Sequence, residues 1–322
     1  MKKIKKIVIL GGDPNSINSE IIIKCWEKIS YSIKKRIYII ANAKLIKKQL
    51  HVIDRSIKIK TVKSINEKSK KDELKIININ LDFKDPFNIV PKDAAPYVIK
   101  SLELGHKIAL NKNSAGLINC AINKNLLLKK NVGVTELLAQ KCKIKDKSEV
   151  MMIRNKQLAV CPITTHLDLK DVFRSIKKQT IIVKIKTIHK QFIKLLKKKP
   201  KIAILGLNPH NAELRKKSEE VNEIIPAILN LKKLGYYISG PFSADTIFIK
   251  DYKKYDVIVG MYHDQVLGPF KTLFKYNGIN ITLGLKYLRV SPDHGVAIDL
   301  IKKNSADESS LLDCINFINK FS

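Results

Sequence analysis

Residues 256–271 read DVIVGMYHDQVLGPFK, and this stretch decides which class of fold the chain can adopt. An apolar run over residues 257–260 is followed closely by an imidazole, a carboxylate and an amide, at His263, Asp264 and Gln265. A short apolar run bounded by polar residues is typical of a strand that is covered on both faces in a parallel sheet. Ligands of such sheets gather at the carboxyl ends of the strands. The position of His263 therefore suggests a functional site, provided that other strands bring partners to it.

Short apolar runs alternate with amphipathic segments on both sides of this stretch. Further strands are expected at residues 6–12, 36–42, 74–80, 115–124, 201–210 and 277–285. Residues 149–166 are expected to form two strands joined by a tight turn at Asn155 and Lys156. Helices are expected at residues 19–29, 43–53, 94–110, 132–142, 168–176, 188–198, 219–235 and 308–321. This alternation predicts an α/β protein with mostly parallel sheets and helices on both faces.

The chain is strongly basic, with 322 residues and a formal net charge of +32. This charge would suit a nucleic-acid-binding protein, but only six of the 61 basic residues are Arg. The arginine fork is favoured for bidentate recognition of bases and phosphates. The lysines are spread through nearly every segment, which favours solvated surfaces over a nucleic-acid interface. Such a positive field would still attract an anionic substrate.

The cysteines and the apolar segments indicate a cytoplasmic protein. None of the five cysteines forms a CxxC pair, and several lie in apolar runs, so buried free thiols are expected. The apolar run at residues 7–10 is too short for a signal peptide and suits a first strand. No segment reaches the length of a transmembrane helix, so no membrane partner is expected.

Three of the seven histidines follow apolar strands. They are His166 after LAVCPITT, His210 after IAILGLNP and His263 after VIVGMY. Three imidazoles from three strand ends can bind one divalent ion and leave positions open for a substrate, as a Lewis-acid site requires. The alternative is that each ring is an ordinary hydrogen-bonding loop residue, because the spacings carry no local motif.

The last third of the chain adds groups that suit an anionic ligand. Lys271, Asn280, Arg289 and His294 lie in or near the glycine-rich stretch at residues 277–295. Lysine and arginine are common partners of phosphate. An ordinary turn-rich connection is the alternative, although the scarcity of Arg favours a role for Arg289. The early GGDPNS loop matches neither the dinucleotide fingerprint GxGxxG nor the P-loop.

These motifs together resemble a known family. TTHLDLKDV, GLNPHNAE, IIPAI, GPFSADTIF, YHDQVLGPFK and GINITLGLKYLRVSPDHG are similar to the 4-hydroxythreonine-4-phosphate dehydrogenase family of pyridoxal 5′-phosphate (vitamin B6) biosynthesis. The resemblance covers nearly the whole chain and is most specific over residues 164–295. It implies a two-domain, isocitrate-dehydrogenase-like α/β fold without a Rossmann fingerprint and with an active-site cleft between the domains.

The resemblance also implies an activity, cofactors and partners. The reaction would be the NAD-dependent oxidation of 4-phosphooxy-L-threonine to 2-amino-3-oxo-4-phosphooxybutanoate, which decarboxylates to 3-amino-2-oxopropyl phosphate. The expected cofactor is NAD or NADP. One divalent ion is expected in each site, and it is Zn, Mg or Co. The family's metal ligands correspond to His166, His210 and His263. Its substrate contacts correspond to Thr135, Lys271, Asn280 and Arg289.

The implied assembly is a cytoplasmic homodimer with a shared active site. The first domain is expected to comprise residues 1–130 with 300–322, and the second, residues 131–299, is expected to carry the metal ligands and the dimer contacts. Asp245 and Asp264 lie beside the motifs and are candidates to orient ligands or accept protons.

Two departures from the family pattern leave the substrate open. The chain reads GVTE where the family usually has GHTE, so Val134 replaces a histidine, and the first loop reads GDPNSINSE instead of GDPAGIGPE. The alternative activity is that of a sister dehydrogenase acting on erythronate or threonate 4-phosphate. A basic nucleic-acid-binding protein is the remaining alternative from a different class.

Overall fold

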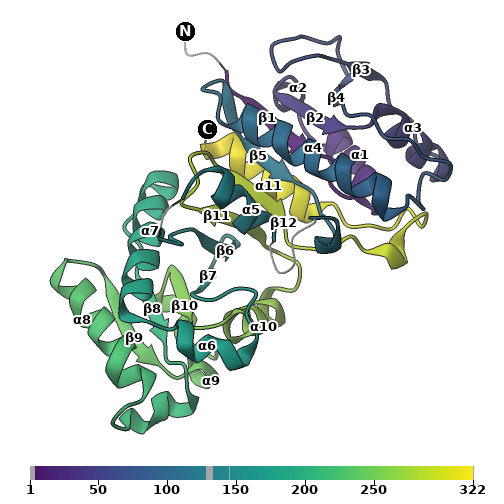
Figure 1. Ribbon diagram of the computed structural model, residues 1–322. Coiled ribbons are helices and arrows are strands. Elements are labelled where there is room, and N and C mark those ends of the chain that lie inside the picture. Colours follow the sequence, from purple (N-terminus) through teal and green to yellow (C-terminus); the bar gives the residue numbers. More distant parts are fainter. Residues whose placement is uncertain (1–3, 128–132, 145, 322) are drawn as a thin grey trace. The chain divides into compact units, whose positions relative to one another are not determined.

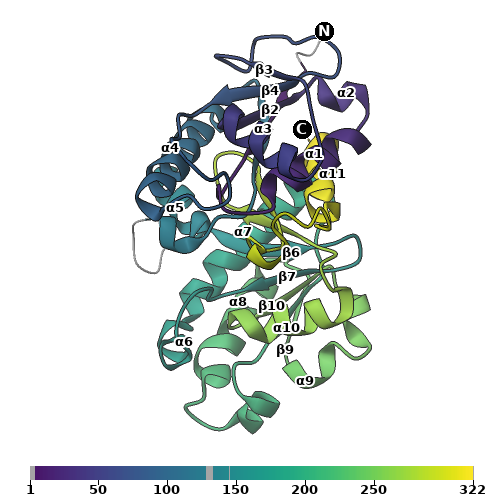
Figure 2. The same ribbon diagram turned by 90° about the vertical axis from the view of Figure 1, so that its right-hand side faces the viewer.

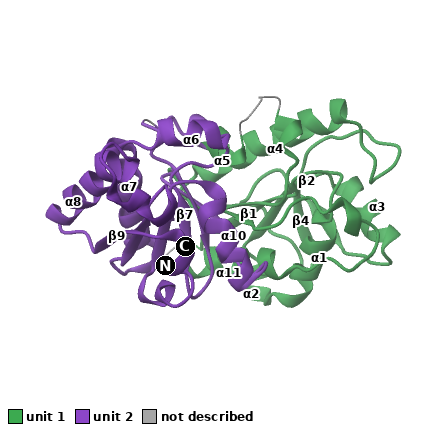
Figure 3. Cartoon of the chain, turned by 90° about the horizontal axis from the view of Figure 1, so that it is seen from below, with its two compact units in different colours: residues 1–138, 286–322 green, residues 139–285 purple. Residues whose placement is uncertain are grey.

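The computed structural model describes residues 4–127, 133–144 and 146–321, which form two compact units. Figure 3 shows unit 1, residues 1–138 with 286–322, and unit 2, residues 139–285. Unit 1 is therefore built from both ends of the chain.

Unit 1 contains a sheet of parallel strands in the order β3-β4-β2-β1-β5-β12 (Figure 1). The strands are β1 (Lys6–Leu10), β2 (Ile37–Ala41), β3 (Ile59–Thr61), β4 (Leu74–Asn78), β5 (Ser114–Asn119) and β12 (Arg289–Pro292). Strands β1 and β2 are buried over nearly their whole length, which explains why they read as continuous apolar runs.

Helices cover both faces of this sheet. They are α1 (Asn18–Lys28), α2 (Tyr31–Lys34), α3 (Ala43–Val52), α4 (Pro91–Ala109) and α11 (Ser309–Phe321), with short turns η1 (Lys124–Leu127) and η5 (Ile298–Leu300). Neighbouring strand residues face opposite sides. Gly116 of β5 lies against Ile318 of α11, whereas Leu117 lies against Gly105 of α4. Figure 2 shows α4 on one face of the sheet and α1 and α11 on the other.

Unit 2 contains a mixed sheet in the order β11-β6-β7-β10-β8-β9. The strands are β6 (Val150–Arg154), β7 (Ala159–Pro162), β8 (Ile202–Leu205), β9 (Ile238–Phe242), β10 (Val257–Gly260) and β11 (Ile279–Leu283). Strands β7, β10, β8 and β9 are parallel, and β6 is antiparallel to both β7 and β11. The expected turn joins β6 to β7, where Asn155 Oδ1 accepts hydrogen bonds from the N–H groups of Gln157 and Leu158 at 2.8 and 2.9 Å.

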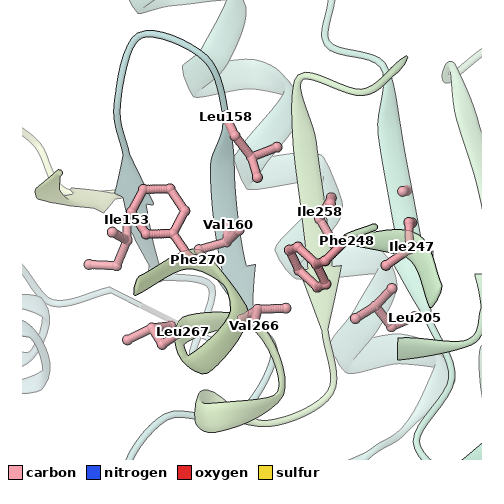
Figure 4. Packing of buried hydrophobic residues seen from close by; sticks show 11 residues of the cluster. Ile153, Leu158, Val160, Leu205, Ile247, Phe248, Ile258, Val266, Leu267 and Phe270 are labelled. Atoms are coloured by element: carbon pink, nitrogen blue, oxygen red, sulfur yellow. The ribbon is translucent and has the colours of Figure 1, made fainter. Parts of the chain in front are cut away.

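One hydrophobic core of unit 2 lies between its sheet and helices α9 and α10. The helices are α6 (Leu169–Ser175), α7 (Lys178–Leu196), α8 (Ile225–Lys233), α9 (Ala244–Ile247) and α10 (His263–Phe274), with turns η2 (Pro209–Leu214), η3 (Glu220–Ile224) and η4 (Asp251–Lys254). Figure 4 shows Val266, Leu267 and Phe270 of α10 packed with Val160 of β7 and Ile258 of β10.

Most of the expected elements are present, and the α/β class is confirmed. Helix α7 begins at Lys178 instead of Ile188, because Ile181 and Ile185 continue its buried face. Helices α2, α9 and α10 and strands β3, β9 and β12 are additional to those expected. None of the helices among the described residues combines the length and the apolar character needed to cross a lipid bilayer.

The unit boundaries differ from those expected from the sequence. Residues 286–299 belong to unit 1, because β12 pairs with β5 and packs against α11. The expected boundary between residues 130 and 131 lies outside the described residues, and unit 1 extends to Leu138, within helix α5 (Val134–Lys141).

Candidate functional site

Three neighbouring parallel strands of unit 2 deliver the three histidines to one edge of the sheet. Strand β7 ends at Pro162, β10 at Gly260 and β8 at Leu205, and these strands are adjacent in the order β7-β10-β8. The carboxyl ends of adjacent parallel strands meet at one edge, which is where ligands of such sheets bind. The next residues of each chain segment carry His166, His263 and His210.

Hydrogen bonds fasten these strand ends to one another. Thr164 donates from both its backbone N–H and its hydroxyl to the carbonyl of Met261, at 3.1 and 2.8 Å. The Gln265 amide accepts from the Met261 N–H at 2.6 Å and donates to the Gly206 carbonyl at 2.7 Å. Gln265 and Thr164 are both buried, so these bonds are shielded from water. The edge is therefore a rigid support for the side chains that follow each strand.

His166 and His263 lie together at this edge. Their ring centroids are 5.7 Å apart and their planes are inclined by 39°. The sequence suggested that His263 lies at the end of its strand. In the structure β10 ends at Gly260, and His263 is the first residue of α10. Two imidazoles that bind one ion through nitrogens about 2 Å from it have ring centres roughly 5 Å apart. The separation of the two rings is thus close to that of two imidazoles on a shared divalent ion.

Asp264 sets the orientation of the His263 ring. The Nδ1 atom of His263 lies 2.8 Å from Asp264 Oδ1. A carboxylate on one ring nitrogen fixes the tautomer and directs the other nitrogen to a metal, as in carboxylate–histidine–metal arrangements. Of the two aspartates singled out in the sequence, Asp264 is thus placed to position a ligand.

His210 is not brought to this pair. Residues 210–214 all have positive φ, from 48° to 57°, which forms a left-handed turn in residues that are not glycine. The His210 ring lies with Nε2 3.6 Å from Asp245 Oδ2, and both side chains are exposed. Within the described ranges, no three His, Cys, Asp or Glu side chains converge closely enough to hold an ion. The structure therefore brings two of the three histidines together, His166 and His263, and leaves His210 apart from them.

The loop that carries His210 is anchored at its base. Glu220 is fully buried and accepts hydrogen bonds from the backbone N–H groups of Leu207 and Asn208, both at 2.8 Å. Burial raises the pKa of Glu220, but these bonds and those from the Asn208 side chain outweigh it, so the net pKa lies below the ordinary value. Gly206 leaves room for this packing, because a Cβ there would lie 2.2 Å from Asn211 Oδ1.

Two of the expected substrate contacts also belong to unit 2. Lys271 lies in α10, with Nζ 5.9 Å from the centre of the Tyr276 ring. Asn280 lies in β11, and its side-chain oxygen is buried without a hydrogen-bond partner among the described residues. Buried polar atoms are almost always paired. This amide oxygen is therefore suited to a ligand that supplies a donor.

The other two substrate contacts, Arg289 and Thr135, lie close together in unit 1. Arg289 is 3% exposed and begins β12, where it donates from Nε to Asn119 Oδ1 at 2.5 Å and from Nη1 to Thr135 Oγ1 at 3.4 Å. Burial lowers the pKa of Arg289 to about 10, which leaves it charged at neutral pH. Both of these acceptors are neutral and orient the guanidinium, while the negative charge of Glu136 acts on it as well.

Sequence analysis did not identify the residues that support these side chains by hydrogen bonds, although it named Gln265 as the amide that follows an apolar run. Asn119, Thr164, Gln265 and Glu220 each support a candidate functional side chain through buried hydrogen bonds. The available signal was a polar residue at or just after the end of an apolar strand, which Asn119 and Thr164 share, whereas Gln265 lies within α10. Glu220 follows no strand and gives no such signal.

Comparisons with known proteins agree with the resemblance seen in the motifs. A 4-hydroxythreonine-4-phosphate dehydrogenase from Sulfurihydrogenibium sp. (strain YO3AOP1) is 39% identical over 318 residues, covering 96% of each chain. The crystal structure of a 4-hydroxythreonine-4-phosphate dehydrogenase from Klebsiella pneumoniae matches with a TM-score of 0.82 and 28% identity, over 98% of each chain. A D-threonate 4-phosphate dehydrogenase from Cupriavidus necator is 30% identical, over 96% of this chain and 95% of the relative.

A family model covers most of the chain as well. Residues 33–318 match the model described as pyridoxal phosphate biosynthetic protein PdxA. This range includes all three histidines, the four expected substrate contacts and the supporting residues Asn119, Thr164, Glu220 and Gln265. The chain belongs to the PdxA family of pyridoxal phosphate biosynthetic proteins.

Proposed function

We propose that this protein is a 4-hydroxythreonine-4-phosphate dehydrogenase of pyridoxal 5′-phosphate biosynthesis. It oxidises 4-phosphooxy-L-threonine to 2-amino-3-oxo-4-phosphooxybutanoate, which loses CO2 to give 3-amino-2-oxopropyl phosphate. The observation that carries the proposal is the pair of imidazoles, His166 and His263, at adjacent strand ends in a chain of the PdxA family. A dehydrogenase of this family implies a nicotinamide cofactor, and we propose NAD with NADP as the alternative.

The metal ligands in this proposal are His166, His263 and His210. Two observations support it: the rings of His166 and His263 lie 5.7 Å apart, and Asp264 contacts Nδ1 of His263. His210 would complete the set by leaving Asp245, to which it is held only by an exposed contact at 3.6 Å. A divalent ion such as Zn, Mg or Co supplies a Lewis acid that polarises the reacting oxygen of the substrate.

The proposed substrate contacts divide the recognition of the molecule among them. Arg289 offers a planar fork for two phosphate oxygens, whereas Lys271 offers a point charge. Asn280 accepts a hydrogen bond from a substrate donor through its buried oxygen. Thr135 contacts Arg289 and limits the positions that its guanidinium can take. Contacts that hold the reacting carbon in a fixed orientation are a large source of rate enhancement.

The proposed assembly is a cytoplasmic homodimer with a shared active site. This part rests on the family resemblance. All five cysteines are free and buried, which suits a reducing compartment. Sedimentation provides the test, since a fully active monomer would contradict the shared site.

A second candidate function is the oxidation of a threonate or erythronate 4-phosphate. Val134, at the start of α5 and next to Thr135, stands where the family motif usually has a histidine. A relative named D-threonate 4-phosphate dehydrogenase shares 30% identity with this chain. An aliphatic side chain beside a substrate contact removes one polar partner, which changes the discrimination between an amino and a hydroxyl substituent.

A single assay separates these functions. NADH formation is measured with 4-phosphooxy-L-threonine, D-threonate 4-phosphate and erythronate 4-phosphate, each after chelation and after re-addition of Zn, Mg or Co. Highest kcat/KM with 4-phosphooxy-L-threonine, and with a metal present, supports the proposal. A preference for threonate or erythronate 4-phosphate supports the second candidate. If no substrate yields NADH or NADPH with any of these ions, the dehydrogenase proposal is wrong.

A further inference from the structure

Unit 1 contains a cavity of about 330 Å³ at the amino ends of its strands. Lys6 is the first residue of β1, Tyr38 the second of β2 and Lys75 the second of β4, and all three line the cavity. Ligands of parallel α/β sheets normally bind at the opposite, carboxyl edge. This cavity is therefore on the other edge of the unit 1 sheet from Asn119, the last residue of β5, which holds Arg289.

The most unusual group in this cavity is the Lys75 ammonium. The residue is 3% exposed, and Nζ donates to the carbonyls of Lys35 and Lys34 at 3.0 and 3.4 Å. It also lies 4.5 Å from the centre of the Tyr38 ring. No carboxylate among the described residues forms an ion pair with it. Burial and the nearby charge of Lys6 lower the pKa of Lys75 to about 8. A buried cation without an anionic partner is costly and rare.

Aromatic rings hold further ammonium groups around the cavity. Lys34 Nζ lies 5.4 Å from the Trp26 ring centre, and Lys35 Nζ lies 4.3 Å from the Tyr31 ring centre. Such cation–π contacts position a lysine without neutralising its charge. Because ammonium groups already occupy faces of these rings, stacking of an aromatic ligand is not the favoured use of the cavity.

The charge of the lining is strongly positive. Six lysines and two carboxylates line the cavity, so the formal balance is +4. Both carboxylates have partners within the wall: Asp72 pairs with Lys34 at 3.2 Å, and Glu73 accepts from the Lys70 N–H at 2.7 Å. The lining therefore keeps an excess of positive charge around Lys75. An anion with more than one charge is the ligand that this composition suits.

We propose that this lysine cavity is a second binding site, specific for a small polyanion of the diphosphate class, with Lys75 as the central contact. Ammonium groups are compact point charges that bind phosphate oxygens through charge-assisted hydrogen bonds. The bound anion supplies the countercharge that Lys75 lacks.

The site has a predictable dependence on pH. An anion beside Lys75 raises its pKa, so binding is coupled to the protonated form and weakens as pH rises above about 8. The charged and titratable groups that line the cavity with Lys75 are Lys6, Tyr31, Lys34, Lys35, Tyr38, Lys68, Lys70, Asp72 and Glu73.

The test is calorimetric titration of the full chain with inorganic pyrophosphate at moderate salt. Wild type is expected to show saturable binding, and Lys75→Met is expected to bind at least about tenfold more weakly, because a charged hydrogen-bonding partner is lost. Lys48→Gln is the matched control, since Lys48 is an exposed lysine outside the cavity that also lies over an aromatic ring, Phe83, at 5.9 Å. Its affinity should change by less than about twofold.

A second variant keeps the proposal falsifiable if Lys75→Met folds poorly. Lys68 and Lys70 are exposed at the rim, and their joint replacement by Gln should weaken binding by about threefold or more while the thermal melt stays that of wild type. The proposal is overturned if wild type shows no saturable binding, or if Lys48→Gln loses as much affinity as the cavity variants.

Discussion

Arg289 Nε donates to Asn119 Oδ1 at 2.5 Å and so joins the first residue of β12 to the last residue of β5. Both side chains are buried. The bond spans 170 positions of the sequence and connects the two segments of unit 1. The acceptor of the Nε hydrogen bond is a neutral amide and not a carboxylate. Asn119, together with Thr135, thus orients the buried guanidinium.

The first prediction concerns that amide. Asn119→Ala removes the acceptor and leaves a buried N–H of Arg289 unsatisfied, which should lower the free energy of unfolding by about 1–3 kcal/mol. Asn119→Asp retains an acceptor and should preserve stability, but its carboxylate competes with phosphate and should raise KM for the phosphorylated substrate. Urea denaturation and steady-state kinetics measure the two effects. Wild-type stability and KM in Asn119→Ala would show that this bond does not position Arg289.

The second prediction assigns phosphate recognition to Arg289. Arg289→Ala should weaken the stabilisation of the transition state by about 2–5 kcal/mol. This loss is equivalent to a decrease in kcat/KM of roughly 30-fold to several thousand-fold. Arg289→Lys should recover only part of it, because the planar fork is lost.

The readout for Arg289 is the preference for the phosphorylated substrate over its unphosphorylated analogue. Arg289→Ala should lose most of this preference, and Lys48→Gln, which removes an exposed charge, should change kcat/KM by less than about twofold. An Arg289→Ala enzyme that discriminates as well as wild type would place phosphate recognition elsewhere.

The third prediction concerns the paired imidazoles. His166→Ala and His263→Ala should each lower the affinity for the divalent ion by more than about 100-fold, since even residues that only support a ligand cost 10–100-fold. The metal content after dialysis is measured by elemental mass spectrometry, and this measurement does not depend on activity. His51→Ala, at an exposed position near the end of α3, is the control. If both variants retain the metal, His166 and His263 are not its ligands.

The fourth prediction follows from the lowered pKa of Glu220. A carboxyl group whose pKa is lower in the folded than in the unfolded state stabilises the fold above the unfolded value, and this contribution is lost as pH falls through the folded value. Glu220→Gln should therefore be less stable than wild type at neutral pH, by about 1.5–3 kcal/mol for the lost charged hydrogen bonds.

The difference between Glu220→Gln and wild type should narrow on acidification below the ordinary carboxyl value of 4.5. Denaturant unfolding at neutral and acidic pH measures it. Glu213→Gln, an exposed carboxyl group in the neighbouring turn, should show no such dependence. A gap that is constant across this range would mean that the shift of Glu220 is not coupled to folding.

The fifth prediction concerns the thiols. All five cysteines are buried, and burial raises the pKa of Cys120 to about 12 and raises the pKa values of Cys25, Cys161 and Cys314 further above their ordinary value. Because the thiolate is the reactive form, iodoacetamide should leave the native protein unmodified near neutral pH and alkylate five sites after denaturation. Rapid alkylation of Cys120 in the native state would contradict this burial.

The strands were predictable where the apolar run was uninterrupted. The run at residues 257–260 coincides with β10, because side chains covered on both faces must all be apolar or small. The turn at Asn155 was predictable because its side chain replaces backbone hydrogen bonds. In both places local chemistry and tertiary structure require the same residues.

The elements that were missed depend on distant partners. Helix α10 contains Gly268 and Pro269, which both disfavour a helix locally, but burial of Val266 and Phe270 against the sheet compensates for them. Strand β12 reads RVSP and acquires its conformation from pairing with β5, far away in the sequence. Neither effect is visible in a short window.

The candidate site was predictable to a similar degree. Ligands of parallel sheets bind at strand ends, and this rule predicted that His166 and His263 lie near each other, as they do. It did not predict the position of His210, because left-handed backbone in five successive non-glycine residues is disfavoured locally and is imposed by tertiary packing. It also gave no indication of the acceptor that Asn119 provides for Arg289.

The composition of unit 1 from two distant segments has a consequence for protein synthesis. During translation the ribosome releases all of unit 2 before β12 and α11. Domains generally fold as they emerge, so residues 139–285 can reach their native packing while the first sheet still presents β5 as an open edge. An unpaired edge is a template for association with other nascent chains. Until β12 and α11 are synthesised, β5 is exposed at the edge of the sheet, so this is the period in which binding of a molecular chaperone would most reduce aggregation.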